Sequence, residues 1–151
     1  MKLAIVFLLT ISASATASPC LTYEGEVTLR GTLSKRTFPE QPDYESIAKG
    51  DAAATYFFVS PRQPFCVSAS DPEDFKPAEP RVVSVQLAFA PGEIAYNALR
   101  PYLGSDVECR GMLFHAISGH HHTPVLLSQA GCHASPSTQA DDSPAARGPR
   151  N

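Results

Sequence analysis

The sequence contains no tryptophan and few charged residues. Asp, Glu, Lys and Arg make up 18% of its 151 residues, below the roughly 25% of an average soluble domain. Its 14 prolines are nearly twice the usual share. These figures exclude collagen, a coiled coil and a mostly disordered chain, and they argue against a helical bundle. The net charge of −3 argues against a general nucleic-acid-binding protein, because such proteins are normally basic.

The motifs of the common enzyme classes are absent as well. The chain has no G-x-S-x-G nucleophile motif, no H-E-x-x-H zinc motif, no Walker loop and no Rossmann fingerprint. No two cysteines are spaced as C-x-x-C, which leaves a thioredoxin-like redox role without support. No catalytic chemistry follows from these residues, and we do not expect an enzyme.

The first residues have the layout of a secretory signal peptide. Met1-Lys2 supplies a positive start, Leu3–Ile11 is almost wholly apolar, and Ala15-Thr16-Ala17 fits an A-x-A cleavage site. The apolar run is about half the length needed to cross a bilayer, so a short membrane anchor is the alternative reading. We predict a signal peptide over residues 1–17 and a periplasmic or secreted protein without stable membrane insertion after cleavage.

The last 18 residues, 134–151, contain three prolines and no apolar side chain larger than alanine. Such a segment buries too little surface to offset the entropy lost on ordering. We predict a disordered tail there. A single domain over residues 18–133 remains, with about 115 residues to build one small core.

Four cysteines follow the predicted cleavage site: Cys20, Cys66, Cys109 and Cys132. An even number in an exported chain predicts two disulfides, with a cysteine-ligated metal site as the alternative. In the hairpin expected from residues 107–129, Ala116 faces Thr123. Cys109 then lies opposite roughly residue 130, near enough to Cys132 for a bridge. Cys20 and Cys66 pair by elimination.

Hydrophobic periodicity predicts three strands in the first part of the domain. Apolar and polar residues alternate over residues 27–34 and 82–89, as in half-buried strands. Residues 54–60 are aromatic and rich in side chains that favour strands. Residues 65–68 are expected to extend the sheet of this second strand after a proline-containing turn.

The period then changes to that of a helix. Apolar residues between Ile94 and Leu103 have helical spacing, with Pro101 expected to distort the last turn. Two further strands are expected over residues 107–116 and 123–129. Three strands, a helix and two strands predict a mainly β fold, a small five-stranded OB-type Greek-key barrel with one short helix between strands 3 and 4. An open α+β sandwich is the alternative.

Four of the five histidines lie between residues 115 and 122. In an extended chain His120 and His122 point the same way, and His115 lies on the facing strand. Three imidazoles, with water or a carboxylate in the fourth place, would form a zinc or copper site. His133 would approach this site if Cys109 and Cys132 are bridged.

A structural role for the same histidines is the competing interpretation. A buried histidine usually bonds a backbone carbonyl or a hydroxyl, and Ser118 and Thr123 are near in sequence. pH sensing or proton chemistry is a further possibility, because histidine titrates near neutral pH. The candidate binding residues follow from this loop: His115, Gly119, His120, His121, His122 and Thr123.

The strand and loop that carry these histidines resemble a family of small exported bacterial proteins classed as a domain of unknown function. Its marks are a strand with a V-x-G pattern and a G-H-H-H-T segment. The segment is intact as Gly119–Thr123, whereas the strand pattern is spaced more widely, as Val107–Gly111. Three upstream stretches are similar to the same family: Cys20-Leu21-Thr22-Tyr23, Gly31-Thr32-Leu33 and Phe65-Cys66-Val67. The resemblance implies no activity, and Cys109 within the widened pattern supports an extra bridge.

We therefore expect a periplasmic or secreted binding or interaction module that uses its His-rich hairpin loop. Loops at the ends of such barrels commonly bind ligands, and the partner would be an envelope protein, a glycan or a small ligand. The alternative is a zinc- or copper-binding protein, or a metal-dependent enzyme, centred on His115, His120 and His122. An exported enzyme inhibitor is a third, weaker hypothesis.

Overall fold

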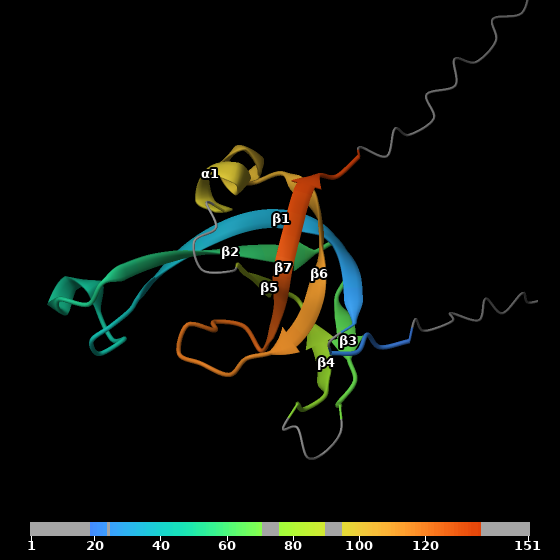
Figure 1. The fold of residues 1–151 in the computed structure, drawn as a ribbon, viewed down its shortest axis with the longest axis horizontal. Coiled ribbons are helices and arrows are strands. Elements are labelled where there is room, and N and C mark those ends of the chain that lie inside the picture. The colour runs from blue at the N-terminus through green and yellow to red at the C-terminus, as the bar shows by residue number, and fades with distance from the viewer. Residues whose placement is uncertain (1–18, 24, 71–75, 90–94, 137–151) are drawn as a thin grey trace, which may run out of the picture.

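The computed structural model describes residues 19–23, 25–70, 76–89 and 95–136, and they form a mainly β fold (Figure 1). The strands are β1 (Glu26–Pro39), β2 (Ala53–Pro61), β3 (Phe65–Val67), β4 (Glu79–Val82), β5 (Val85–Ala88), β6 (Asp106–His115) and β7 (Val125–Ala134). The helical elements are the 3-10 turns η1 (Ile47–Lys49) and η3 (Arg100–Tyr102) and the short α1 (Ala95–Leu99). None of the described helices has the length and apolar character needed to cross a bilayer.

Five strands close into a barrel in the order β1-β2-β5-β7-β6, and β6 pairs with β1 to complete the ring. The β5–β7 pair is parallel, and the other pairs are antiparallel. The helix α1 lies in the chain between the third and fourth barrel strands. The predicted mainly β fold with one short helix is confirmed. The strand order is compatible with the expected OB-type barrel, and the closed ring differs from the alternative of an open sandwich.

Alternation along the strands places the core inside the barrel. In β1 the inward-facing Leu29 and Leu33 are buried, while Thr28 and Arg30 face solvent. Gly31 is needed where β1 and β2 meet, because a Cβ atom there would lie 2.1 Å from the carbonyl oxygen of Ser60. The core residues come from every barrel strand and include Leu33, Val59, Val85, Leu87, Val107, Leu113 and Leu127.

The third predicted strand, residues 82–89, is divided in the structure. Its first part belongs to β4, which pairs with β3 in a separate two-stranded sheet, and its second part is β5 of the barrel. Val83 between them is 49% exposed, because the chain leaves one sheet there to enter the other. The prediction that residues 65–68 extend the sheet of β2 is therefore wrong, because β3 pairs with β4 in the separate sheet.

The helix expected over residues 94–103 is shorter than predicted. It begins at Ala95 among the described residues and gives way to a 3-10 turn that contains Pro101. Proline has no backbone N–H to continue α-helical bonding. At the carboxyl end of the domain, Ala134 is still part of β7, so the described fold runs past the predicted start of the tail. The predicted signal peptide and tail residues 137–151 lie outside the described residues.

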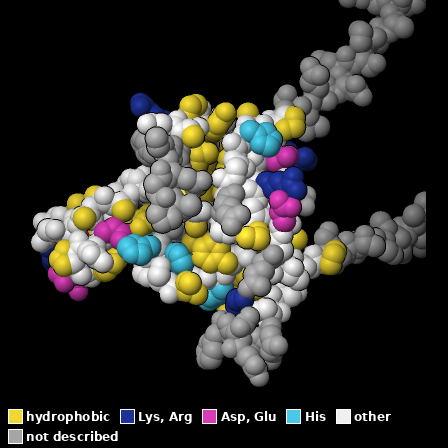
Figure 2. Space-filling model, viewed as in Figure 1, with side chains coloured by type: hydrophobic (Ala, Val, Ile, Leu, Met, Phe, Trp, Pro, Cys, Tyr) yellow, Lys and Arg dark blue, Asp and Glu magenta, His cyan; other side chains and the backbone are white. Residues whose placement is uncertain are grey.

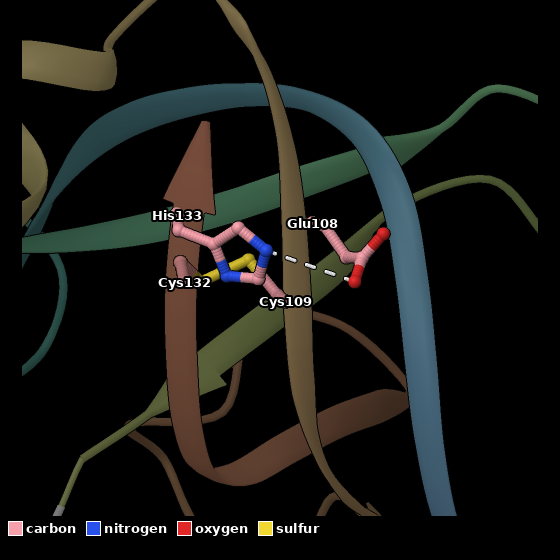
Figure 3. The surroundings of a disulfide bond; sticks show 4 residues. All are labelled: Glu108, Cys109, Cys132 and His133. Atoms are coloured by element: carbon pink, nitrogen blue, oxygen red, sulfur yellow. Dashed lines mark ion pairs between the residues drawn. A yellow bond between two sulfur atoms is a disulfide. The ribbon is translucent and has the colours of Figure 1, made fainter. Parts of the chain in front are cut away.

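The structure has two disulfides, Cys20–Cys66 and Cys109–Cys132, the same pairing that the sequence predicts. Cys109 and Cys132 are direct partners in the β6–β7 ladder, because a register shift after Arg110 moves the pairing from the expected position. Figure 3 shows His133 beside this disulfide, with its Nε2 atom 3.7 Å from Oε1 of Glu108. The two bridges are compatible with an exported chain.

The β1–β2 hairpin continues beyond the barrel as an arm (Figure 1). β1 pairs with β6 only over residues 26–32, whereas it pairs with β2 as far as Pro39. We call residues 34–57 the arm and residues 116–124, between β6 and β7, the His loop. In Figure 1 the His loop, drawn in orange, lies on the side of the barrel from which the arm extends.

Candidate binding site

The His loop covers part of the outer surface of the barrel. Phe58, Gln86 and Leu126 are successive partners across β2, β5 and β7, and all three point away from the barrel core. Outward-facing strand residues are normally exposed, yet these side chains are at most 2% exposed. The loop covers Gln86, since its His120 and His122 bond to that side chain, and Arg36 and Phe38 of the arm lie against Phe58.

Gln86 joins the His loop to the barrel through three hydrogen bonds. Its Nε2 donates to the carbonyl oxygen of His120 at 2.8 Å, and its Oε1 accepts from the backbone N–H of His122 at 2.6 Å. Its own backbone N–H donates to Oγ1 of Thr123 at 3.0 Å, and that hydroxyl donates to the carbonyl of Val125. One buried side chain thus satisfies two backbone groups of the loop, the carbonyl of His120 and the N–H of His122.

His122 is enclosed by the aromatic residues of the arm. Its ring stacks on Phe38, with centroids 3.7 Å apart and planes 6° apart, and meets Tyr56 edge-on at 4.9 Å. Its Nε2 is buried without a hydrogen-bond partner among the described residues. Burial is the main cause that lowers the pKa of His122, while Glu40 opposes that shift. A neutral imidazole fits this apolar surrounding.

Glu40, at the end of β1, holds His120 and Tyr56 together. Its Oε2 lies 2.5 Å from Nδ1 of His120, and its Oε1 accepts a short hydrogen bond from the Tyr56 hydroxyl. The carboxylate side chain is 10% exposed, whereas the His120 side chain is 49% exposed. Burial and the adjacent carboxylate raise the pKa of Tyr56, so its hydroxyl stays protonated and donates.

The tip of the arm places Tyr44 beside His120. The two rings meet edge-on with centroids 5.7 Å apart, and Tyr44 is 39% exposed. Tyr44 has a φ of 58°, a left-handed conformation that is uncommon for a residue with a side chain. The Asp51 carboxylate stabilises this turn by accepting the backbone N–H groups of Asp43, Glu45 and Ser46 at 2.6–3.0 Å. The chain thus fixes an exposed aromatic ring in a constrained turn.

We expect Asp51→Asn to lower the thermal midpoint at pH 7 and to weaken its acid dependence. The bonds from Ser46, Asp43 and Glu45 hold the pKa of Asp51 below its usual value. Such a carboxylate stabilises the fold fully above its unfolded pKa of about 3.9, and the contribution is lost as the pH falls through the folded-state pKa. Thermal unfolding of both chains between pH 7 and pH 2 measures this. If the thermal midpoints of the two chains change with pH in parallel over that range, Asp51 does not contribute to the acid dependence of stability.

A surface pocket of about 320 Å³ opens where β2 and β5 diverge. These strands pair only through Phe58–Gln86 and Val59–Val85. The residues that line the pocket come from the arm, β5 and the His loop: Thr55, Tyr56, Gln86, Leu87, Ala88, Phe89, His120 and His121. Figure 2 shows several histidine side chains on this face of the molecule, with acidic and hydrophobic side chains beside them. The volume suits one or two rings of a small ligand.

The predicted metal ligands do not come together. His115 lies edge-on to Tyr23, and its Nε2 is 3.9 Å from Oε1 of Glu79, away from the arm contacts of His120 and His122. His133 pairs with Glu108 at the other end of the β6–β7 ladder. Across the described ranges, no group of three or more His, Cys, Asp or Glu side chains is placed to hold a metal ion. The convergence that the zinc or copper hypothesis requires is therefore not observed.

The remaining predicted residues shape the His loop. His121 accepts the backbone N–H of Ile117 at Nδ1 and meets Phe114 edge-on. Gly119 faces the Tyr44 ring, where an added Cβ would come within 3.7 Å. Thr123 is buried on Gln86, as described above. These contacts match the predicted hydrogen-bonding role for the loop more closely than they match a metal site.

Sequence reasoning missed the partners of the loop, namely Phe38, Glu40, Tyr56 and Gln86. Tyr56 and His120 are 64 positions apart, so no local spacing links them. One signal was available in the sequence. Gln86 is a polar residue in a strand of otherwise small or apolar neighbours, which marks it for attention although alternation alone assigns it to the outer side of the strand.

Residues 84–128 match a family described as a domain of unknown function (DUF4431). The matched range contains Gln86, β6 and the whole His loop, and it leaves out the arm. The match supports the expected resemblance to a family of unknown function and assigns no activity. No curated protein and no solved structure matches the chain.

Proposed function

We propose that this protein is an exported binding module whose ligand site is the surface between the arm and the His loop. One observation carries the proposal. Both the backbone and the exposed ring of His120 are held, because Gln86 donates to its carbonyl oxygen and Glu40 bonds Nδ1 of its imidazole. A surface side chain fixed in this way is pre-organised for contact, since little rotamer freedom remains to be lost on binding.

The position of the site in the barrel supports the same function. The tip of the arm connects the first two barrel strands, and the His loop connects the last two. In OB-type barrels the corresponding pair of loops, with the face of the second and third strands between them, binds extended ligands. This support is by analogy of fold, and the contacts of His120 supply the specific evidence.

Export is part of the proposal. The signal-peptide layout of residues 1–17 directs the chain out of the cytoplasm, into the periplasm or the medium. The two disulfides suit an oxidising compartment. Partners would then be envelope proteins, glycans or small ligands in that compartment.

The test is to map ligand contacts on the ¹⁵N-labelled mature chain by NMR. Four classes of probe are added in turn: neutral oligosaccharides, acidic oligosaccharides, capped extended peptides and small dicarboxylic acids. We expect at least one class to shift amide signals in residues 40–46 and 118–123, and to leave residues 106–110 unchanged. His120→Ala should weaken that binding about tenfold, which corresponds to roughly 1.4 kcal/mol.

A matched control is available in His133, which is also exposed and also paired with a glutamate. We expect His133→Ala to leave binding unchanged, because His133 lies at the far end of the β6–β7 ladder. Signals that shift only outside the arm and the His loop, or no shift with any class of probe, would contradict the proposed site.

A further inference from the structure

We propose that the ligand of this site is a neutral saccharide, with a hydroxyl group bonded to Nε2 of His120 and a sugar ring packed against Tyr44. This inference rests on the proposed binding function and names the chemical class of its ligand. It follows from the charge balance at Glu40, from the orientation of the His120 ring and from the way the arm presents Tyr44.

The buried carboxylates of the site are already paired. Both oxygens of the Glu40 carboxylate are engaged, Oε1 by the Tyr56 hydroxyl and Oε2 by His120. The Asp51 carboxylate is likewise engaged by three backbone N–H groups. A charged ligand gains most from an unpaired opposite charge, and neither of these buried carboxylates offers one. Beside His120 the buried carboxylates therefore leave no charge for a ligand to pair with, and a polar, uncharged group fits this position.

The His120 ring has one nitrogen that Glu40 does not occupy. Glu40 occupies the Nδ1 side of His120, so Nε2 is the ring nitrogen directed away from the carboxylate. In a neutral ring with its proton on Nδ1, Nε2 accepts a hydrogen bond, and in the protonated ring it donates one. A hydroxyl group pairs with either form, because it both donates and accepts. Saccharides carry such groups at high density.

Two tyrosines of the arm border this imidazole. Tyr44 is 39% exposed and stands edge-on to His120, and Tyr56 lines the adjoining pocket. A tyrosine ring offers a large, rigid and amphipathic contact surface at low entropic cost. The apolar C–H face of a sugar ring packs on such a surface while its hydroxyl groups reach the imidazole. Before the ligand arrives, the turn held by Asp51 fixes the backbone around Tyr44, and the Tyr44 ring rests edge-on against His120.

Other ligand classes fit these observations less well. Nucleic acid requires a basic surface, whereas the chain has a net charge of −3 and the arm tip carries Asp43 and Glu45. An acidic saccharide meets the same carboxylates. A capped peptide remains a distinct outcome of the experiment below, because its backbone would bond to strand edges rather than to the His120 ring.

The test is a titration of the full mature chain with a set of neutral oligosaccharides, including chitotriose, cellotriose and maltotriose, by calorimetry and NMR. We expect at least one to bind. Tyr44→Ala and His120→Gln should each lower the affinity for that saccharide about tenfold. Tyr56→Phe should lower it less, because the Tyr56 hydroxyl bonds to Glu40 and not to the ligand. The controls Ile117→Ala, on the same loop, and His133→Gln should stay within about twofold of the unchanged chain.

Glu40→Gln tests the positioning of the ring separately. We expect the ¹⁵N signals of the His120 imidazole to change, together with a loss of saccharide affinity, while the circular dichroism spectrum stays the same. Affinity and imidazole signals that are both unaffected would show that Glu40 does not orient His120 for the ligand.

The outcomes separate the two proposals. If none of the neutral oligosaccharides binds while a peptide or an acid shifts residues 40–46 and 118–123, the saccharide inference is wrong and the binding site stands. If saccharides bind but shift signals only elsewhere, the saccharide inference is wrong, and the proposed site fails as well when no other class of probe shifts residues 40–46 and 118–123. Saccharide affinity that is unchanged in both Tyr44→Ala and His120→Gln also overturns the proposed contacts of the sugar with these two residues.

Discussion

Replacing Gln86 by alanine is expected to release the His loop from the barrel. The substitution leaves the carbonyl of His120 and the N–H of His122 without their buried partner. Each unsatisfied buried group costs about 1–3 kcal/mol, and a cavity under the loop adds to this. We expect the free energy of unfolding to fall by roughly 3 kcal/mol, and the His122 amide to exchange with solvent about a hundredfold faster.

Urea unfolding and hydrogen exchange of the labelled chain measure these two effects. Gln86→Glu is a matched variant, because it keeps the acceptor for His122 and loses the donor to the carbonyl of His120. At acid pH the glutamic acid regains an O–H donor, so part of the exchange protection should return. Gln63→Ala, at an exposed position, should change neither measurement. A His122 amide that stays equally protected in Gln86→Ala would show that the side chain does not hold the loop.

The importance of Gln86 also marks where sequence reasoning stops. Alternation in β5 correctly places Val85 and Leu87 in the core, and it assigns Gln86 to the solvent side. Gln86 does point away from the barrel core, as the alternation predicts. It is nevertheless buried, because the His loop folds over the outer surface of the barrel at this point. A period of two describes which side of a strand a residue faces and carries no information about what covers that side.

The arm was underestimated for a related reason. The first strand was expected to end at Ser34, since Lys35, Arg36 and Thr37 break the alternation of apolar and polar residues. In the structure β1 continues to Pro39 because β2 supplies its hydrogen-bond partners and Phe38 packs on His122. Pairing with β2 thus keeps residues 35–39 in a strand, although their own composition does not predict one.

The histidines show that nearness in sequence does not ensure a shared site. His115 ends β6 and faces Tyr23 and Glu79, whereas His120 and His122 turn toward the arm. The metal hypothesis assumed that the strand and the loop face the same space. The loop instead bends over the outer surface of the barrel, a path set by Gln86 and Phe38, which lie far from it in sequence.

The cysteine pairing was accessible to sequence reasoning because it depends on one hairpin. Once β6 and β7 are neighbours, Cys109 has a single cysteine within reach, and the remaining pair follows. The observed partner position, 132, lies two residues from the expected one, and the register shift between Arg110 and Met112 accounts for one of the two without changing the cysteine partner. Local constraints of this kind are predictable, whereas the packing of the arm against the loop required the folded chain.

Reduction of both disulfides is expected to unfold the protein at 37 °C. The bridges close loops with sequence separations of 46 and 23 residues. In the chain-entropy account, loops of this size contribute about 4 and 3 kcal/mol through the unfolded state. Their sum is comparable to the whole stability of a small domain, roughly 5–15 kcal/mol. The fold would then depend on an oxidising compartment, as the proposed export requires.

The two bridges should not be equivalent. β6 and β7 remain paired along their ladder without Cys109–Cys132, so Cys109→Ala/Cys132→Ala should unfold at lower urea with an intact native structure. Cys20–Cys66 instead tethers the segment whose Leu21 is bridged to Val67. Cys20→Ala/Cys66→Ala should lose more stability, because its bridge closes the longer loop, and should loosen the packing of Tyr23 against His115.

Urea unfolding with and without dithiothreitol, followed by tyrosine fluorescence and circular dichroism, measures both effects. The chain with both pairs replaced by alanine serves as the control, because dithiothreitol has no disulfide to act on in it. Its unfolding midpoint should match that of the reduced natural chain. A reduced natural chain that unfolds at the same urea concentration as the oxidised one would show that the barrel and the His loop are stable without either bridge, and that the disulfides give no reason for export.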